Sequence, residues 1–371
     1  MILFTLILII VLAYLGLIVA FTIGLGKALP QALPRNGIGM PISVIVAFKD
    51  EALNLPNLLD ALMNQSFPKE KFEVILVNDH SSDKSLSTVD HYCTLNSNFR
   101  LINLPENKTG KKGAIALGID SANYPLVALT DADCVLGKKW LEYISSEARN
   151  GSVLMLGPVV MTPLDNLTQK FQALEYSSLM ASAAGSCGIG RPIIASSANL
   201  AFRNDVLNVS MDILNPKVSS GDDMFLLHHA KRFQNGKISF MGSRDAIVET
   251  ATVTSLQKAM VQRKRWASKS LYYKDIDTIV AGFVVLLFSL ALVFLLIASI
   301  FNVENLYYFL VLMLIKSLVD FILLYKYLSF AEQKKLLKVF LPLQLVYPVY
   351  IVYSFFAGIF IKPLWKGRSI G

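Results

Sequence analysis

The sequence predicts an α/β domain with a mainly parallel sheet, set between an N-terminal transmembrane helix and C-terminal transmembrane helices. Three observations predict this fold class. The chain of 371 residues is 54% hydrophobic and only 17% charged, which is too apolar for a soluble domain of this size and points to lipid. Uncharged stretches long enough to cross a bilayer occur near both ends. Between about residues 40 and 274, short β-rich runs alternate with helical patterns, which is typical of α/β architecture.

The charge balance and the cysteines exclude several other classes. Lys and Arg number 35 against 27 acidic residues, and we interpret this net charge of +8 as attraction to anionic lipid headgroups and not to nucleic acid. The high apolar content excludes a disordered chain. Cys93, Cys134 and Cys187 follow no paired or metal-ligand spacing, which excludes a disulfide-rich secreted scaffold and fits a reducing compartment.

The first element is a transmembrane helix over residues 1–26, which carry no charge. A signal peptide is the rival interpretation, and it is disfavoured because no Lys or Arg precedes the apolar run. Lys27 and Arg35 follow this run, so the positive-inside rule places the next region in the cytoplasm.

The α/β domain, residues 40–254, comes next. Its predicted strands are Ile42–Phe48, Phe72–Val77, Phe99–Leu104, Leu126–Leu129 and Ser152–Val160. The predicted helices among them are Leu53–Gln65, Lys111–Ser121 and Lys138–Arg149. Such crossovers join the early strands in parallel. Because ligands of these sheets bind at the carboxyl ends of the strands, acidic residues that follow the strands predict the functional site.

Two polar clusters follow the first two strands. The run Lys49-Asp50-Glu51 either offers a loop carboxylate to a nucleobase or sugar, or belongs to the N-terminal cap of the next helix. Asp79 can present its carboxylate to an imide N–H while residues 81–83 shape the turn. A plain β-to-α turn is the alternative for this second cluster.

A pair of carboxylates, Asp131 and Asp133, follows the fourth strand. Hard oxygen ligands of this kind bind Mg²⁺ or Mn²⁺ through one or two carboxylates, while a diphosphate supplies further oxygens. An Asp-Ala-Asp turn without any ligand is the alternative. We interpret the neighbouring Cys134 as a small buried hydrophobic residue.

The last cluster combines Asp222 and Asp223 with a basic helix. The two carboxylates open a helical stretch, where a carboxylate stays ionised and can act as a base toward a hydroxyl. The side chains that share one face of the later helix are an amide, a guanidinium suited to a diphosphate and an indole suited to a sugar ring: Gln262, Arg265 and Trp266. Residues 255–275 also predict an amphipathic helix at the lipid headgroups, and both interpretations can hold together.

Three further transmembrane segments are predicted within residues 276–361. They correspond to the apolar stretches Thr278–Val303, Leu306–Tyr325 and Val339–Ile361. The basic linker before the last stretch is expected in the cytoplasm, which places the basic tail, residues 362–371, outside, against the positive-inside rule. Pro342 and Pro348 predict that the last segment is broken or re-entrant.

Two ionisable residues, Lys316 and Asp320, lie inside the third transmembrane segment. They are four residues apart, so they share one helix face and can neutralise each other. They either line a path for a polar acceptor or form an ion pair buried against neighbouring helices. The sequence leaves both interpretations open.

Taken in order, these clusters resemble the family 2 inverting glycosyltransferases, which have a GT-A nucleotide-sugar-binding domain and include cellulose, chitin and hyaluronan synthases and ceramide glucosyltransferase. The resemblance covers about residues 40–275. It implies that the nucleotide-sugar donor is bound by Ala47, Lys49, Asp50, Glu51, Asp79, Lys111, Asp131, Gln262 and Arg265. Asp131 and Asp133 match the D-x-D motif and are the implied ligands of Mg²⁺ or Mn²⁺. Val46 and Lys49 stand where Pro and Asn are usual in the family.

The resemblance also implies the acceptor side and a single-displacement mechanism. Asp223 matches the catalytic base, which takes the proton of an acceptor hydroxyl as that hydroxyl attacks the anomeric carbon. Arg265 then offsets charge on the departing diphosphate, which Gln262 helps to orient. The residues implied near the acceptor are Trp266, Asp222 and, from a weaker match, Arg203.

We therefore expect an integral membrane glycosyltransferase with a cytoplasmic catalytic domain. It is expected to transfer a sugar from a nucleotide sugar, with UDP favoured by family habit, to a lipid or lipid-linked acceptor. A processive polysaccharide synthase that exports its glycan is the first alternative, because Q-x-x-R-W is common in processive members. An inactive membrane scaffold is the second, although it gives no reason for carboxylates at four successive sites.

Overall fold

The computed structural model describes residues 2–29, 39–215, 221–232, 236–360, 364–365 and 368–369. The chain divides into two compact units, each built from separate stretches of sequence. The α/β unit comprises residues 28–162 and 194–251, and the helical unit comprises residues 1–27, 163–193 and 252–371. Arg35 and most of the predicted basic tail lie outside the described residues.

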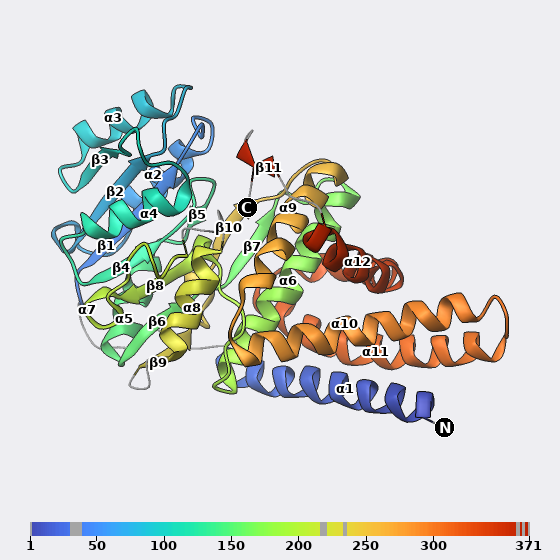
Figure 1. The fold of residues 1–371 in the computed structure, drawn as a ribbon. Coiled ribbons are helices and arrows are strands. Elements are labelled where there is room, and N and C mark those ends of the chain that lie inside the picture. The colour runs from blue at the N-terminus through green and yellow to red at the C-terminus, as the bar shows by residue number, and fades with distance from the viewer. Residues whose placement is uncertain are drawn as a thin grey trace. The chain divides into compact units, whose positions relative to one another are not determined.

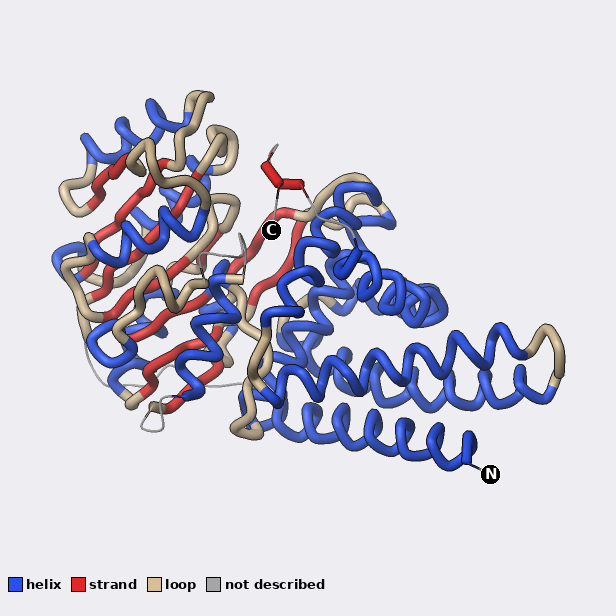
Figure 2. The backbone as a smooth tube through the Cα atoms, in the orientation of Figure 1, coloured by secondary structure: helices blue, strands red, loops and turns tan. Residues whose placement is uncertain are grey.

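The main sheet of the α/β unit has the strand order β3-β2-β1-β4-β8-β6-β9 in the described part of the chain (Figures 1 and 2). Strands β1 to β4 are parallel, and β8 runs antiparallel to both β4 and β6. All seven residues of β2 are buried, as expected for a strand covered on both faces. The predicted mainly parallel α/β architecture is confirmed. The strands are β1 (Ile42–Phe48), β2 (Phe72–Asn78), β3 (Phe99–Asn103), β4 (Leu126–Leu129), β6 (Ser152–Leu156), β8 (Leu200–Arg203) and β9 (Lys237–Phe240).

Helices of the α/β unit connect these strands. In α2, four leucines at helical spacing are buried, and a proline in the first turn fits the start of a helix. The three predicted helices are confirmed in place, with ends that differ by up to two residues. The α-helices are α2 (Leu55–Met63), α3 (Ser85–Leu95), α4 (Lys111–Asp120), α5 (Trp140–Arg149), α7 (Asn204–Leu207) and α8 (Asp222–Arg232). The short 3₁₀ turns are η1 (Lys69–Lys71), η2 (Ser197–Asn199) and η3 (Arg244–Ala246).

The predicted single strand Ser152–Val160 is wrong, because two strands occupy this stretch. Gly157 and Pro158 separate β6 from β7 (Val159–Thr162), and a proline cannot donate to a strand ladder. The first part stays in the main sheet. The second part joins a smaller sheet, in the order β5-β10-β7, with β5 (Val135–Leu136) and β10 (Val248–Ala251).

The helical unit contains four helices, among the described residues, that are long and apolar enough to cross a membrane: Thr5–Ala28, Ile276–Ala298, Glu304–Phe330 and Lys334–Ile359. The last helix continues through Pro348, so the predicted break is absent. The α-helices of this unit are α1 (Ile2–Ala28), α6 (Leu167–Gly188), α9 (Leu256–Ser268), α10 (Ile276–Ala298), α11 (Glu304–Phe330) and α12 (Phe340–Phe360). The remaining short elements are η4 (Lys269–Tyr272), η5 (Lys334–Val339), β11 (Leu364–Trp365) and β12 (Arg368–Ser369).

A buried polar network joins α1, α11 and α12, and α1 lies beside the α10–α11 hairpin in Figure 1. The Lys316 ammonium donates to Asp320 Oδ2 and to Gln344 Oε1, at 2.6 Å each. Asp320 Oδ1 accepts a hydrogen bond from the Tyr14 hydroxyl at 2.7 Å. Lys316 is only 2% exposed. The structure therefore agrees with the interpretation of an ion pair buried against neighbouring helices.

Candidate functional site

The carboxyl ends of the parallel strands gather the predicted acidic residues at one edge of the main sheet. Asp50 follows β1, Asp79 follows β2 and Asp131 follows β4. Strand β1 pairs with β4 in parallel, so Asp50 and Asp131 follow neighbouring strands at the same edge, where ligands of such sheets bind. We call this edge, with Asp131, Asp133 and Lys111, the acidic edge.

Lys111 links several of the predicted residues at the acidic edge. It is the first residue of α4, where the preceding Gly110 has a φ of +92° that a residue with a side chain rarely adopts. Its Nζ donates to Asp131 Oδ1 at 2.5 Å and to Ser197 Oγ at 2.8 Å.

The pKa of Lys111 depends on carboxylates from both acidic motifs, Asp131 and the Asp222-Asp223 pair. Burial alone would lower the pKa of the Lys111 ammonium group. The charge of Asp131, followed by those of Asp222 and Asp223, raises this pKa above its usual value. Asp131 and the Asp222-Asp223 pair therefore lie within electrostatic reach of one cation.

Asp133 lies in an environment with excess negative charge. Burial raises its pKa, and the charges of Asp131 and Glu51 add to this effect, so that the pKa rises to about 6. Thr250 Oγ1 donates to Asp133 Oδ2 at 3.3 Å. The adjacent Cys134 is 1% exposed, and burial raises the pKa of its thiol, in agreement with a small hydrophobic role.

This donor set fits a hard divalent cation that is only partly coordinated by protein. Asp131 and Asp133 offer carboxylate oxygens from one turn, and the repulsion between them would be relieved by a positive charge. Within the described residues, no three His, Cys, Asp or Glu side chains are grouped to hold a metal by themselves. The remaining ligands would come from water and from a bound diphosphate, as is common for Mg²⁺.

Hydrogen bonds connect the loop after β1 with the loop after β2. Asp50 has a φ of +52°; its Oδ1 accepts from the Ser82 N–H at 2.7 Å, and its own N–H donates to Ser81 Oγ at 3.1 Å. The bond from Ser82 lowers the pKa of Asp50. Asp79 is 2% exposed, and its Oδ1 accepts from the Gly110 N–H at 3.1 Å. These bonds fix the shape of the loops where the nucleobase is expected.

The other predicted donor-site residues of the first strand and its loop occupy the same edge. Ala47 is the half-buried residue of β1 that pairs with Val77 of β2, and Lys49 follows the end of β1. Glu51 Oε2 accepts from Asn54 Nδ2 at 2.7 Å, just before α2.

Asp222 and Asp223 form the first turn of α8, after Gly221 with a φ of +90°. Asp222 is 5% exposed, whereas Asp223 is more accessible. Asp223 Oδ1 accepts from the Met224 N–H at 2.7 Å. A carboxylate at this helix N-terminus is stabilised in its ionised form.

The Q-x-x-R-W residues lie on α9 of the helical unit, where α6 contacts them. Gln262 Oε1 accepts from Gln172 Nε2 at 2.5 Å. The rings of Trp266 and Tyr176 are 5.8 Å apart. Arg265 occupies the last turn of the helix. Stacking of Trp266 on an acceptor stays a prediction.

A second contact of α9 involves Arg263, which lies off the motif face. Its Nε is 3.2 Å from Glu175 Oε1 on α6, and Glu175 Oε2 accepts from the Tyr350 hydroxyl of α12 at 2.9 Å. The side chains of Arg263 and Glu175 are 17% and 9% exposed, so the pair is largely removed from water. Helix α9 is thereby held between α6 and α12.

Arg203 is not brought to the acidic edge. It lies opposite Leu126, at the start of β4, because β8 runs antiparallel to β4. Asp131 follows the other end of β4. The Arg203 guanidinium pairs instead with Asp205 at 2.5 Å. The placement therefore does not support the predicted role of Arg203 near the acceptor.

Several residues that contact the predicted site residues were not identified from the sequence, among them Ser197, Thr250 and Gln172. Ser197 binds Lys111, Thr250 binds Asp133 and Gln172 binds Gln262. Of these, only Ser197 has a local signal, because it lies six residues before the predicted site residue Arg203. The other two come from distant elements with no recognisable pattern.

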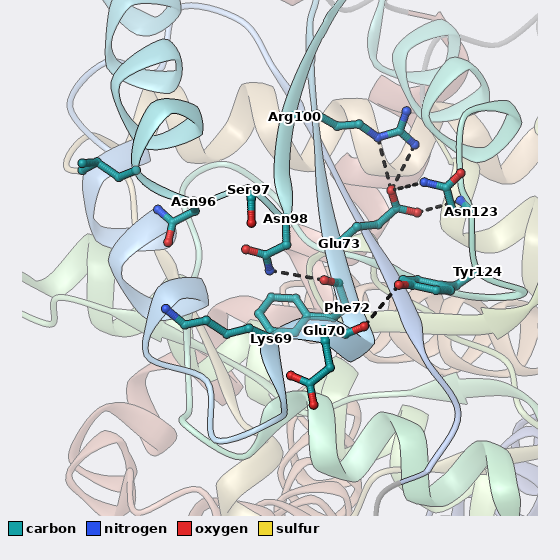
Figure 3. A pocket seen from close by; sticks show the side chains of 11 residues that line it. Lys69, Glu70, Phe72, Glu73, Asn96, Ser97, Asn98, Arg100, Asn123 and Tyr124 are labelled. Atoms are coloured by element: carbon teal, nitrogen blue, oxygen red, sulfur yellow. Dashed lines mark hydrogen bonds and ion pairs between the residues drawn. The ribbon is translucent and has the colours of Figure 1, made fainter.

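A separate cavity of about 680 Å³ lies at the opposite edge of the sheet, beside the start of β2 and β3 (Figure 3). Three of the polar side chains that line it bind one another, because Arg100 and Asn123 both donate to Glu73. Glu73 accepts from Ser43 Oγ and Asn123 N at 2.6 Å each, from Asn123 Nδ2 at 2.8 Å and from Arg100 Nε at 3.2 Å. We call Glu73, Ser43, Arg100 and Asn123 the Glu73 cluster, which ties neighbouring strands together.

Comparison with known families agrees with this geometry. The family described as Glycosyl transferase family 2 matches residues 43–207, and Glycosyl transferase family group 2 matches residues 126–326, which is more than half of the chain. The two matches together include both acidic motifs and the Q-x-x-R-W helix.

Known proteins with related sequences include two named glycosyl-transferring enzymes. Glycosyltransferase AglE of Haloferax volcanii is 26% identical over 207 residues, or 56% of this chain and 65% of AglE. Poly-β-1,6-N-acetyl-D-glucosamine synthase of Staphylococcus aureus is 28% identical over 143 residues, or 38% of this chain and 33% of the synthase. The chain thus matches less than two thirds of the length of either relative.

A solved structure shows the same fold. The mannosyltransferase PcManGT from Pyrobaculum calidifontis, in complex with GDP-Man and Mn²⁺, superposes with a TM-score of 0.55 and 16% identity over 98% of this chain and 99% of its own. The expected GT-A fold is confirmed. With a family match that covers more than half of its length, the chain belongs to the family 2 glycosyltransferases.

Proposed function

We propose that this protein is a membrane-bound inverting glycosyltransferase that transfers a sugar from a nucleotide sugar to a hydroxyl group of a lipid or lipid-linked acceptor. The observation that carries the proposal is the environment of Lys111. This cation binds Asp131 directly and is within electrostatic reach of Asp222 and Asp223. A metal-binding carboxylate and a general base are therefore available at one edge of a nucleotide-binding sheet.

The donor end of the site is assigned to the loops after β1, β2 and β4. Asp79 and the fastened Asp50 loop support recognition of the nucleobase and ribose. A divalent cation held by Asp131 and Asp133 would offset the charge of the departing nucleoside diphosphate. Lys111 adds a fixed positive charge beside Asp131. A UDP-sugar is the first donor to test, and GDP-mannose is the second, because PcManGT was solved with it.

The acceptor is activated by Asp223 in this proposal. Its carboxylate takes the hydroxyl proton while the acceptor oxygen forms a bond to the anomeric carbon. The bond from that carbon to the diphosphate oxygen breaks on the opposite side, and its electron pair leaves with the nucleoside diphosphate. Asp223 is favoured over Asp222 because it is the more accessible of the two.

A lipid or lipid-linked acceptor is supported by the unit that carries Q-x-x-R-W. Helix α9 packs against α12, one of the four helices that are able to span a membrane. Exposed apolar side chains, such as Leu256 and Val261, lie on the same helix as Lys258 and Lys264. This combination suits the headgroup region of a bilayer. The positive-inside rule supports a cytoplasmic location for the α/β unit.

A processive polysaccharide synthase is the second candidate function. It is supported by the 28% identity to poly-β-1,6-N-acetyl-D-glucosamine synthase, whose name describes a polymer product. Product length separates the two candidates: single transfer gives one defined glycolipid, whereas a processive enzyme gives a ladder or a long polymer.

Nucleotide release by the detergent-purified protein tests the proposal. We would supply UDP-, GDP- and dTDP-sugars with Mg²⁺ or Mn²⁺, with and without a lipid extract, and include Asp223→Asn as the inactive control. Release from one donor that requires both metal and lipid is the expected result. Neither release nor nucleotide binding with any donor would contradict the proposal and favour an inactive scaffold.

A further inference from the structure

Helix α6 presents to α9 three side chains that no sequence pattern singles out. Gln172, Glu175 and Tyr176 lie at positions i, i+3 and i+4, so they share one face of α6. Their partners on α9 form the pairs Gln172–Gln262, Glu175–Arg263 and Tyr176–Trp266. Two of these three partners belong to Q-x-x-R-W.

The direction of the hydrogen bonds from Gln172 is fixed by a backbone group. The Val253 N–H can only donate, and it donates to Gln172 Oε1 at 2.9 Å. The amide nitrogen of Gln172 therefore faces the other way, and it donates to Gln262 Oε1 at 2.5 Å. Gln172 is 6% exposed, so this chain of bonds is shielded from competing water.

The same chain of bonds fixes the orientation of the Gln262 amide. Because Oε1 accepts from Gln172, the amide end with the two N–H donors of Nε2 is not the end that meets α6. Among the described residues, none accepts a hydrogen bond from Gln262 Nε2. Phosphate oxygens only accept hydrogen bonds, so an amide that presents N–H groups attracts a diphosphate, whereas one that presents its carbonyl oxygen repels it.

We propose that Gln172 is a positioning residue that orients Gln262 as a hydrogen-bond donor toward the anionic leaving group. This inference rests on the proposed function. The buried ion pair of Arg263 with Glu175, and the bond from Tyr350 to Glu175, hold α9 in the rotation that brings Gln262 to Gln172.

The substitution Gln172→Glu tests the proposal. A carboxylate still accepts from the Val253 N–H, but it cannot donate to Gln262. The Gln262 amide then has to turn over, so that its N–H groups bind the new carboxylate and its oxygen faces outward. We expect kcat/KM for the donor to fall about 10- to 100-fold, the range for one hydrogen bond to a charged group. Because the new carboxylate is buried near Glu175, kinetics would be measured below the melting temperature of the variant, where it remains folded.

A matched control is available one turn earlier on α6. Gln169 is also buried, but its Oε1 serves only as an acceptor for the N–H groups of Asp165 and Asn166, at 3.0 Å each. Glutamate fills this capping-box position equally well. Gln169→Glu should therefore keep kcat/KM within about twofold, although it makes the same chemical change.

A double-mutant cycle separates positioning from a merely structural role. If Gln172 acts through Gln262, then Gln172→Glu should add no further loss to a Gln262→Ala protein. Equal losses in the two backgrounds, or an unchanged Gln172→Glu protein, would overturn the proposal while the wild-type enzyme remains active. A wild-type protein that neither binds a nucleotide nor transfers a sugar would instead overturn the proposed function, and this inference with it.

Discussion

The carboxylates at the two edges of the main sheet differ in how many hydrogen bonds they accept and in the charge around them. At one edge, Glu73 accepts four hydrogen bonds from Ser43, Asn123 and Arg100, which satisfy both of its oxygens. At the acidic edge, Asp133 receives only weak hydrogen bonds, from Thr250 Oγ1 at 3.3 Å and from the Cys134 thiol at 3.9 Å. Burial, together with repulsion by Asp131 and Glu51, raises its pKa to about 6.

Hydrogen bonding and nearby charge thus separate structural from functional acids within one sheet. A saturated carboxylate stabilises the fold, because its donors connect β1, β2 and β3. A carboxylate with too few donors and too much like charge costs stability and persists where a ligand supplies the missing positive charge.

The largest effect is expected for Asp223→Asn. The amide has the same shape but cannot accept the acceptor proton, so the transfer rate should fall about 10²- to 10⁴-fold. Nucleotide affinity, measured by calorimetry, should stay nearly unchanged. Asp222→Asn is the control, and a greater loss there than at Asp223 would move the base to Asp222.

Removal of a metal-binding carboxylate should affect binding without a cost in stability. Asp133→Ala is expected to weaken Mn²⁺-dependent nucleotide binding by about 10- to 100-fold. Its melting temperature should be unchanged or higher, because a repelled and largely buried charge is lost. Unchanged affinity in the presence of Mn²⁺ would contradict the role of Asp133.

The Glu73 cluster should show the reverse behaviour. In Glu73→Gln the new N–H₂ group opposes the donors of Arg100 and Asn123, so the free energy of unfolding should fall by about 2–4 kcal/mol. Thermal melting would measure this loss. Nucleotide affinity of the remaining folded protein should be normal, and a selective loss of affinity would break the contrast between the edges.

The smallest effect is expected at Arg203, which lies on the edge away from Asp131. Its partly exposed pair with Asp205 contributes little, so Arg203→Gln should change stability by less than about 1 kcal/mol. Transfer should stay within about twofold of wild type. A large increase in KM for the acceptor, with the donor KM unchanged, would restore the role that the sequence suggested.

The parts that could be predicted from the sequence depend on local patterns. Strands β1 to β4 are continuous apolar runs, and their parallel pairing places Asp50, Asp79 and Asp131 at one edge. The direction of β8 has no such local signal. It depends on pairing with β4 and β6, and this pairing moved Arg203 away from the site.

The role of α6 also could not be predicted from local sequence patterns. Its apolar positions give no clear face, and its partners on α9 follow 90 residues later, as the Gln172–Gln262 pair shows. The split at Gly157 and Pro158 is different. The proline was visible in the sequence and is a sufficient reason to end the strand.

The interleaved order of the two units has a consequence for the synthesis and engineering of the protein. Residues 163–193, which include α6, leave the ribosome before the α/β unit is complete and well before the helix that neutralises Glu175. A chain that ends before Arg263 would leave Glu175 of α6 without the cation that pairs with it. A soluble form of the α/β unit therefore cannot be made by trimming both ends of the chain; it also requires excision of residues 163–193.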